Sequence, residues 1–307
     1  MNKDNILINF RDDFELICTL FKNNKIPNSI IIDGKEGIGK HTFAKHLINY
    51  IFSFNDINSY NTKKFEINIL SKSYKLILNN SHPNLYTINL NENKNSISVE
   101  QIRDMIKYAN KSSFDNKYKI ILINKSEYLN KSSSNALLKI LEEPSDNTIF
   151  LILQNSENKN LKTIQSRCIK FNLRLDFKRV IETVNLILDD DINNLITKDL
   201  ISYYNSPGQI ISLLNFAKNL DINIYNTSIA DFIKIIIDKK LYLKDSFMKK
   251  SFNSFLERYL LNITMINKEL KNFNYYDLFI KNSNNAKIYN MDLETIYLNY
   301  KQKVFNE

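Results

Sequence analysis

Cysteine is scarce in this sequence of 307 residues, where only Cys18 and Cys168 occur. Two cysteines so far apart form neither a disulfide framework nor the paired spacing of a zinc site. His41 and His46 fall on one face of a predicted helix, but neither a third ligand nor an HExxH pattern accompanies them, so we expect no metal site. This cysteine usage is typical of a reducing compartment, with both thiols packed.

Glycine and proline are also scarce, with four residues of each. Their scarcity argues against a β-sandwich or a linker-rich chain and favours a helical or α/β protein. No segment approaches the ~20 apolar residues that span a bilayer. Residues 1–10 lack the basic and then apolar pattern of a secretory signal, so we expect a soluble, cytoplasmic protein.

The chain carries a formal net charge of +9, spread along the sequence without a dense basic run. Such a charge is compatible with nucleic acid, acidic protein surfaces or anionic lipid as partners, and equally with a solvated surface. Aromatic residues in the C-terminal part recur at helical spacing, which is more typical of helix packing than of base stacking. The sequence indicates no base-specific reading of nucleic acid.

A glycine-rich segment follows the strand predicted over residues 28–32, and it reads Gly34-Lys35-Glu36-Gly37-Ile38-Gly39-Lys40-His41-Thr42. A glycine, four residues and Gly-Lys between a strand and a helix fit the phosphate-binding loop, although a plain glycine-rich turn is the alternative. Such glycines let backbone N–H groups point at phosphate, and Lys40 would meet the β and γ phosphates. His41 takes the place of the Ser or Thr that holds Mg²⁺, and Thr42 comes one place late. The candidate phosphate-binding residues are Gly34, Gly37, Gly39, Lys40 and Thr42.

The middle of the chain has the pattern strand, helix, strand. Residues 120–123 form an unbroken apolar run, which favours a strand buried on both faces of a parallel sheet. Asn130 can cap the following helix, which Pro144 stops. Residues 148–153 predict a second buried strand, and the chain then reaches Ser166-Arg167-Cys168.

The residues after the first of these strands decide whether hydrolysis is expected. A phosphate-loop ATPase of this class normally has Asp here to orient Mg²⁺, followed by Glu to position the attacking water. The sequence has Asn124, which lacks the charge, and Lys125, which has the wrong sign for a general base. Glu127 follows, but we expect it to point elsewhere. The sequence therefore predicts an ATPase fold that no longer hydrolyses ATP.

Strand and helix alternate from residue 3 to about residue 171, which predicts a parallel sheet covered by helices on both faces. The residues that follow show only helical periodicity. We therefore predict an α/β domain over residues 1–172, a small helical domain over 173–220 and a C-terminal helical domain over 221–307. Residues 53–80 are polar and are interpreted as a variable insertion of weak helical content.

Three motifs are specific enough to indicate a family: Ile-Ser-Val-Glu-Gln-Ile-Arg at residues 97–103, Asn-Ala-Leu-Leu-Lys-Ile-Leu-Glu-Glu-Pro at 135–144, and Ser-Arg-Cys at 166–168. Through them the chain resembles the clamp-loader subunits of bacterial DNA polymerase III, most of all those of the delta-prime type. His-Pro-Asn-Leu at residues 82–85 and Asn-Ser-Pro-Gly at 205–208 match as well. The resemblance in motifs covers about residues 28–208, and the C-terminal part agrees only in helical character.

The resemblance implies that the three predicted domains are an AAA+ (P-loop NTPase-like) module, a helical lid and a collar that assembles a five-membered ring. Its partners would be the gamma/tau and delta types of subunit, the sliding clamp and the phosphates of primer-template DNA. Such a ring uses ATP to open the clamp and place it on DNA. In such rings an arginine of one subunit reaches the γ-phosphate held by its neighbour, and Arg167 matches that position. The alternative for Arg167 is a pair with a surface carboxylate.

Two departures from the family bear on activity. Many relatives carry a zinc module with four cysteines after the phosphate loop, whereas residues 52–81 contain no cysteine. Motor subunits place an arginine in the lid where this chain has Gly208. The missing lid arginine, together with His41, Asn124 and Lys125, argues against ATP hydrolysis.

We therefore predict a catalytically silent, non-motor clamp-loader subunit that requires no cofactor and contributes Arg167 to a neighbouring ATPase. Whether ATP binds the altered loop is left open. The alternative is an active AAA+ motor subunit of the gamma/tau type. A plain nucleic-acid-binding module is a third interpretation, which would require a dense basic face or spaced aromatic platforms.

Overall fold

The computed structural model describes residues 3–91, 94–114, 118–157, 162–202, 204, 206–267, 270–289 and 293–305. Of the motif residues given above, Asn205 lies outside them. The chain forms two compact units, Met1–Thr183 and Val184–Glu307, and each is described by itself.

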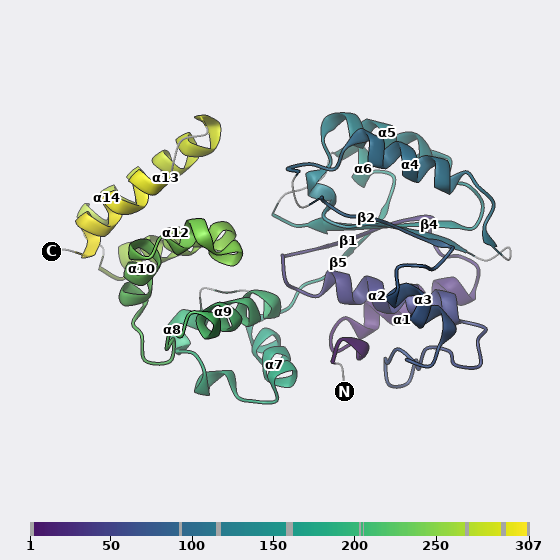
Figure 1. The fold of residues 1–307 in the computed structure, drawn as a ribbon, viewed down its shortest axis with the longest axis horizontal. Helices are drawn as coiled ribbons and strands as arrows, with labels where there is room; N and C mark the ends of the chain where they lie inside the picture. The colour runs from purple at the N-terminus through teal and green to yellow at the C-terminus, as the bar shows by residue number, and fades with distance from the viewer. Residues whose placement is uncertain are drawn as a thin grey trace. The chain divides into compact units, whose positions relative to one another are not determined.

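Strands and helices alternate through the first unit, as the sequence predicts (Figure 1). Its elements are α1 (Arg11–Lys22), β1 (Ser29–Gly34), α2 (Lys40–Ser53), α3 (Lys72–Leu78), β2 (Leu85–Ile88), α4 (Val99–Ala109), β3 (Lys119–Ile123), α5 (Lys131–Glu142), β4 (Thr148–Asn155), α6 (Lys162–Gln165) and β5 (Ile169–Asn172). The five strands form one parallel sheet in the order β2-β3-β4-β1-β5. This parallel sheet with its covering helices is the α/β domain that the sequence predicts.

Helices cover both faces of the sheet, and a hydrophobic core lies on each side. Figure 1 shows α1, α2 and α3 against one face and α4, α5 and α6 against the other. Successive residues of β1 divide between the two cores, since Ile30 and Ile32 pack with Phe14 and Phe43 while Ile31 packs with Leu137. Every residue of β1, β3 and β4 is buried, so the apolar runs predicted as buried strands are confirmed.

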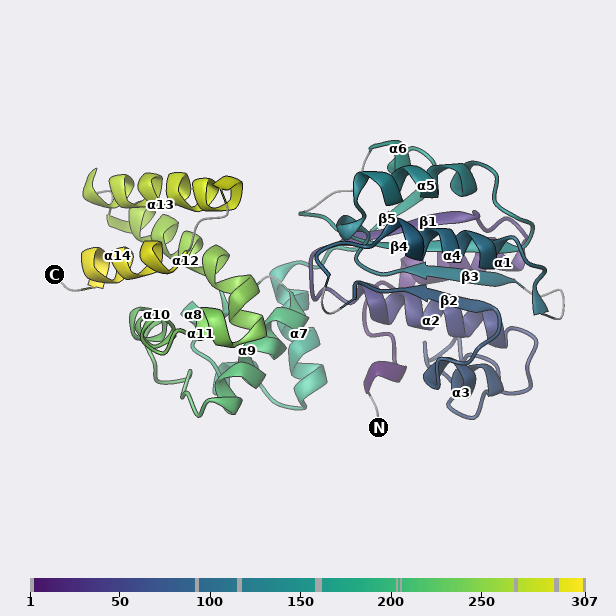
Figure 2. The ribbon, with the colours of Figure 1, turned by 45° about the horizontal axis from the view of Figure 1, so that its top comes forward.

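The starts of α4 and α5 carry capping residues that are visible in the sequence. At the start of α4, the Ser98 backbone N–H donates to the Gln101 side chain at 3.1 Å and Gln101 N–H donates to the Ser98 hydroxyl at 3.4 Å, which completes the capping box. Asn130 caps α5 by accepting from the Ser133 N–H at 2.8 Å. Figure 2 shows α4 and α5 side by side over the sheet.

The predicted insertion over residues 53–80 is better packed than its composition indicates. It contains α3 and a short antiparallel bridge between Asn61 and Glu66. Tyr60 and Phe65 from this segment contact the Phe14 ring of α1, with centroid separations of 5.3 and 6.2 Å. The insertion therefore completes the core on the α1–α2 side of the sheet.

The regular elements described in the second unit are all helical. They are the 3-10 helix η4 (Ile192–Asn194) and the α-helices α8 (Lys198–Ile201), α9 (Pro207–Asn219), α10 (Ile229–Asp238), α11 (Leu241–Lys244), α12 (Ser246–Asn267), α13 (Leu270–Tyr289) and α14 (Glu294–Phe305). The helix α7 (Phe177–Leu188) runs across the division. Aromatic rings of α9, α10 and α12 pack together, including Phe216 against Phe232 and Phe247. The predicted boundary between lid and collar at residues 220 and 221 therefore falls within one compact unit, and it stays a prediction. Across the described residues, no helix has both the length and the apolarity that crossing a membrane requires.

A buried histidine joins the N-terminal segment to α2. His46 is fully buried, with Nδ1 2.8 Å from the Tyr60 hydroxyl and Nε2 3.3 Å from the Asp4 carbonyl oxygen. A neutral ring protonated at Nε2 satisfies both contacts, because Nε2 donates to the carbonyl and Nδ1 accepts from the hydroxyl. Burial lowers the pKa of His46 to about 4, although the Asp4 carbonyl acts in the opposite direction.

We expect His46 to make the protein less stable in mild acid. The unfolded chain binds the proton near the ordinary pKa of 6.5, whereas the folded chain binds it only near 4. The contribution of His46 to folding stability is therefore complete above pH 6.5 and is lost as the pH falls. Between pH 7 and pH 5 the free energy of unfolding should fall by about 2 kcal/mol more in the wild type than in His46→Gln. Urea denaturation followed by circular dichroism measures this difference, and parallel pH profiles of the two proteins would contradict it.

Candidate functional site

The phosphate-loop segment connects the end of β1 to the start of α2. Gly37 and Gly39 adopt φ angles of 77° and 108°, a region that favours glycine. Gly34 is required for a different reason, since a Cβ there would lie 2.9 Å from the Leu173 carbonyl oxygen and 3.0 Å from Ile38 Cγ2. Thr42 lies in the first turn of α2 and is half-buried. The structure thus brings the five predicted loop residues together at one end of the sheet.

Lys40 bonds to its own loop. Its Nζ donates to the Gly34 carbonyl at 2.7 Å and to the Lys35 carbonyl at 2.8 Å. Burial lowers the pKa of Lys40, and the charge of Glu127 is the first of several carboxylates that oppose this shift. The ammonium group that was predicted to bind phosphate therefore bonds to two backbone carbonyls of its own loop.

The two residues that replace the catalytic carboxylates follow β3. Asn124 Nδ2 donates to Asn89 Oδ1 at 2.6 Å, and Asn89 follows β2, on the side of β3 away from β4 and β1. Lys125 has a φ of 53° and is exposed. Neither side chain supplies a carboxylate next to the phosphate loop, as the sequence predicts.

Glu127 lies where sequence reasoning did not place it. Its carboxylate accepts from the backbone N–H of Asn155 at 3.1 Å, at the end of β4 beside β1. It is also close enough to Lys40 for its charge to raise the pKa of that lysine. The prediction that Glu127 points elsewhere was therefore wrong, because the left-handed backbone of Lys125 redirects the chain after β3.

Asp33, a buried acid that sequence reasoning missed, precedes Gly34 on β1. Its carboxylate is 3.0 Å from Lys170 Nζ and accepts from the buried Gln154 Nε2 at 2.9 Å. Gln154 on β4 and Lys170 on β5 thus compensate the negative charge of Asp33 on β1. The sequence did offer one signal for Asp33: it comes directly before Gly34 at the end of a predicted strand, and the ends of parallel strands lie at one edge of the sheet.

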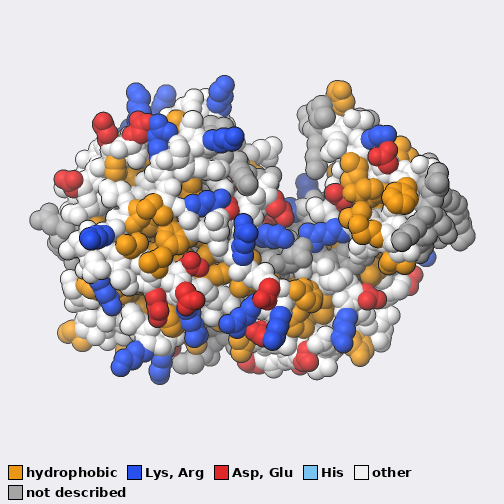
Figure 3. Space-filling model, turned by 180° about the vertical axis from the view of Figure 1, so that it is seen from behind, with side chains coloured by type: hydrophobic (Ala, Val, Ile, Leu, Met, Phe, Trp, Pro, Cys, Tyr) orange, Lys and Arg blue, Asp and Glu red, His pale blue; other side chains and the backbone are white. Residues whose placement is uncertain are grey.

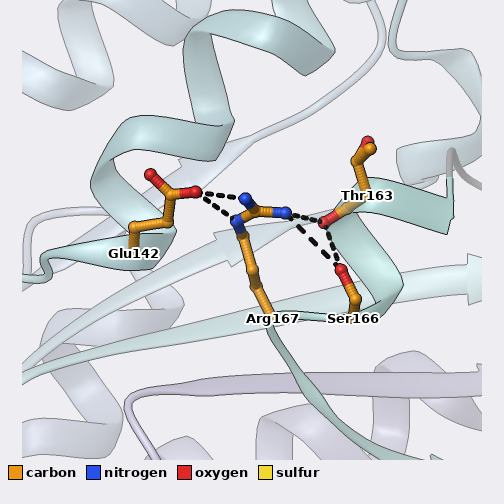
Figure 4. Close-up of polar contacts among 4 residues, drawn as sticks. All are labelled: Glu142, Thr163, Ser166 and Arg167. Carbon is orange, nitrogen blue, oxygen red and sulfur yellow. Dashed lines mark hydrogen bonds and ion pairs between the residues drawn. The ribbon is translucent and has the colours of Figure 1, made fainter.

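Arg167 lies in the turn between α6 and β5, and its side chain is 31% exposed. Its Nε donates to Glu142 Oε1 at 2.7 Å, and Nη2 donates to the same oxygen. Its Nη1 donates to the Thr163 carbonyl at 2.8 Å, with the Ser166 hydroxyl at 3.5 Å (Figure 4). These partners come from α5, α6 and the turn after α6, on the sheet face opposite α2. The carboxylate pair considered as the alternative for Arg167 is therefore present within this chain.

Metal-ligating side chains do not gather in this part of the molecule. Within the described residues, no group of three or more His, Cys, Asp or Glu side chains is placed to hold a metal ion. Cys18 is buried and Cys168 half-buried, and burial raises the pKa of each thiol to about 12. Both cysteines are thus packed and protonated near neutral pH.

A family model described as DNA polymerase III, delta subunit, matches residues 12–176, just over half of the chain. The chain belongs to this family. Its curated relatives include DNA polymerase III subunit delta' of Pseudomonas aeruginosa, 27% identical over 143 residues, and that of Buchnera aphidicola from Baizongia pistaciae, 31% identical over 156 residues. These matches cover 47% and 49% of this chain but only 42% and 45% of the relatives, and they support the delta-prime identification.

Other matches are less specific to the delta-prime type. DNA polymerase III subunit gamma of Buchnera aphidicola from Acyrthosiphon pisum is 28% identical over 238 residues, which is 74% of this chain and 62% of that protein. A DNA polymerase III gamma subunit-related protein of Thermotoga maritima matches in structure with a TM-score of 0.43 and 16% identity, covering 86% of this chain and 77% of that one. A RuvB structure from Thermotoga maritima matches with a TM-score of 0.42 and 15% identity, over 86% and 78% of the two chains.

Gly34→Ala should destabilise the protein by about 1–3 kcal/mol, because the added methyl group meets a backbone carbonyl that cannot move alone. Gly208→Ala is the matched control. Gly208 lies in the first turn of α9, where the same change should be neutral or stabilising by up to about 1 kcal/mol. Thermal or urea unfolding of the two variants measures the difference, and equal stability would show that the contact with Leu173 is not limiting.

Proposed function

We propose that this chain is a non-motor, delta-prime-type subunit of the DNA polymerase III clamp loader. It helps the ATP-driven loading of the sliding clamp onto primed DNA and supplies Arg167 to the ATP site of a neighbouring subunit. The observation that carries this proposal is the position of Arg167 in the Ser-Arg-Cys turn, partly exposed and bonded to α5 and α6 rather than to the phosphate loop. An arginine so placed is available to a phosphate held by another chain.

Catalytic silence is supported by the chemistry at three positions. His41 offers no hydroxyl for Mg²⁺, Asn124 is bonded toward β2, and Lys125 cannot act as a general base. Lys40 is bonded to two carbonyls of its own loop. The chain therefore needs no cofactor of its own in this proposal. ATP bound to the loop would lack a Mg²⁺-binding hydroxyl at position 41 and the carboxylates at positions 124 and 125, and Glu127 is the carboxylate that lies near Lys40 instead.

The proposed partners follow from this role. They are the gamma/tau and delta types of subunit, in a five-membered ring held by the C-terminal helices, together with the sliding clamp, in the cytoplasm. DNA is contacted through its phosphates, whose neutralisation by basic side chains makes affinity depend on salt. In the view of Figure 3 the basic side chains are spread among acidic ones, which suits backbone contacts better than a dense binding track.

An active motor subunit of the gamma type is the second candidate. The gamma relative supports it, because the match covers 74% of this chain, more than either delta-prime match reported above. Against it stand Asn124 and Lys125, since hydrolysis in this class requires carboxylates at these two positions. The purified chain alone separates the two: a motor subunit hydrolyses ATP, whereas the proposed subunit does not.

In the reconstituted loader, Arg167→Ala should reduce clamp- and DNA-stimulated ATP hydrolysis. An arginine finger stabilises charge on the transferring phosphoryl group, so turnover at the completed site should fall by about 10³-fold or more. The matched control is Arg179→Ala, because Arg179 is an exposed arginine that is likewise paired with a glutamate, Glu182 at 3.0 Å. Size-exclusion chromatography verifies that each loader remains assembled. Unchanged turnover with Arg167→Ala would reduce Arg167 to a structural residue.

A further inference from the structure

Arg167 is fixed within its own chain by two separate elements. Glu142 is the last residue of α5 and binds one edge of the guanidinium through a single oxygen, Oε1. The Thr163 carbonyl belongs to α6 and binds Nη1. Figure 4 shows the guanidinium held between them. The long side chain is therefore oriented before any neighbouring subunit is present.

The contacts leave part of the guanidinium available. It carries five N–H bonds, of which Glu142 accepts two and the Thr163 carbonyl accepts one. One N–H remains on each terminal nitrogen, and the Ser166 hydroxyl reaches Nη1 only at 3.5 Å. N–H bonds on the terminal nitrogens are the donors through which arginine contacts phosphate oxygens.

We propose that Glu142 is the positioning residue for Arg167, holding the guanidinium side-on so that its two terminal nitrogens face the γ-phosphate of the adjacent subunit. This inference rests on the proposed function of Arg167. A flexible side chain loses rotamer freedom on binding, and a preformed geometry removes that cost. Glu142 belongs to the Leu-Glu-Glu-Pro motif and Arg167 to Ser-Arg-Cys, so this contact joins two of the motifs in one structure.

The opposite role makes a different prediction. If Glu142 were a latch that keeps Arg167 from the neighbouring phosphate, removing the carboxylate would increase ATP turnover. If it were only a structural contact, removing it would lower the melting temperature and leave turnover unchanged. A positioning residue instead lowers kcat, because misplacing the finger weakens an interaction made in the transition state.

The test compares loaders reconstituted with wild type, Glu142→Gln and Glu142→Ala. We expect Glu142→Ala to lower the kcat of clamp- and DNA-stimulated ATP hydrolysis by about 10-fold or more, with KM for ATP changed by less than about twofold. The kcat of Glu142→Gln should lie between those of wild type and Glu142→Ala, because its amide oxygen keeps an acceptor but loses the charge. Glu143→Ala is the matched control: Glu143 is the adjacent exposed glutamate and is not among the partners of Arg167. It should retain the wild-type kcat.

The same measurement in an Arg167→Ala background shows whether Glu142 acts through Arg167. The positioning role predicts that Glu142→Ala has no further effect there. An equal loss in both backgrounds, or a gain of turnover, would overturn it. In the isolated chain, the Arg167 Nε–H resonance should be protected from exchange in wild type and lose that protection in Glu142→Ala, whether or not the loader assembles. No difference in protection would also overturn the proposal.

The failures of the two proposals are distinguishable. If Arg167→Ala leaves turnover unchanged, the proposed function is wrong and the positioning role falls with it. If Arg167→Ala is inactive while Glu142→Ala matches wild type, the arginine finger stands and only the role of Glu142 is wrong.

Discussion

The parallel pairing of the five strands is the constraint on which the first unit depends. Burial of β1, β3 and β4 makes unpaired polar groups costly along their length, and the polar residues that these strands carry, such as Asp33 and Gln154, lie near the strand ends. Because parallel strands end at the same edge, the loop after Gly34, the Glu127 carboxylate and the Asn155 backbone come together without being close in sequence. The contact of Glu127 with β4 and the bonds of Lys40 are consequences of this arrangement.

Much of this fold could be predicted because its signals are local. The unbroken apolar runs at residues 120–123 and 148–153 have the composition of strands covered on both faces, and the capping box at Ser98 depends on a spacing of three residues. The bond between Glu127 and Asn155 joins residues 28 apart, and that between Arg167 and Glu142 joins residues 25 apart. Side-chain directions over such distances follow from backbone turns that composition does not encode. Polar residues around Tyr60 likewise concealed its place in the core.

The segment predicted as a phosphate loop can persist without carboxylates at positions 124 and 125, because several of its residues also serve the fold. Gly34 allows Leu173 to approach the end of β1, and Lys40 adds a second hydrogen bond to the Gly34 and Lys35 carbonyls, which also accept from the backbone N–H groups of Ser156 and Ile38. Neither role requires nucleotide. In contrast, Asn124 and Lys125 occupy positions where the fold accepts an amide and an exposed cation, so nothing in the packing demands Asp or Glu there.

The close approach of Leu173 to Gly34 makes the loop and the chain leaving β5 a single mechanical element. The Leu173 N–H donates to the Asp33 carbonyl at 2.8 Å, while its own carbonyl lies against the place where a side chain of Gly34 would be. The backbone at Gly34 therefore cannot swing toward Leu173 unless the segment after β5 shifts with it. A displacement of residues 173–176 would thus be transmitted directly to Gly34, where the loop begins.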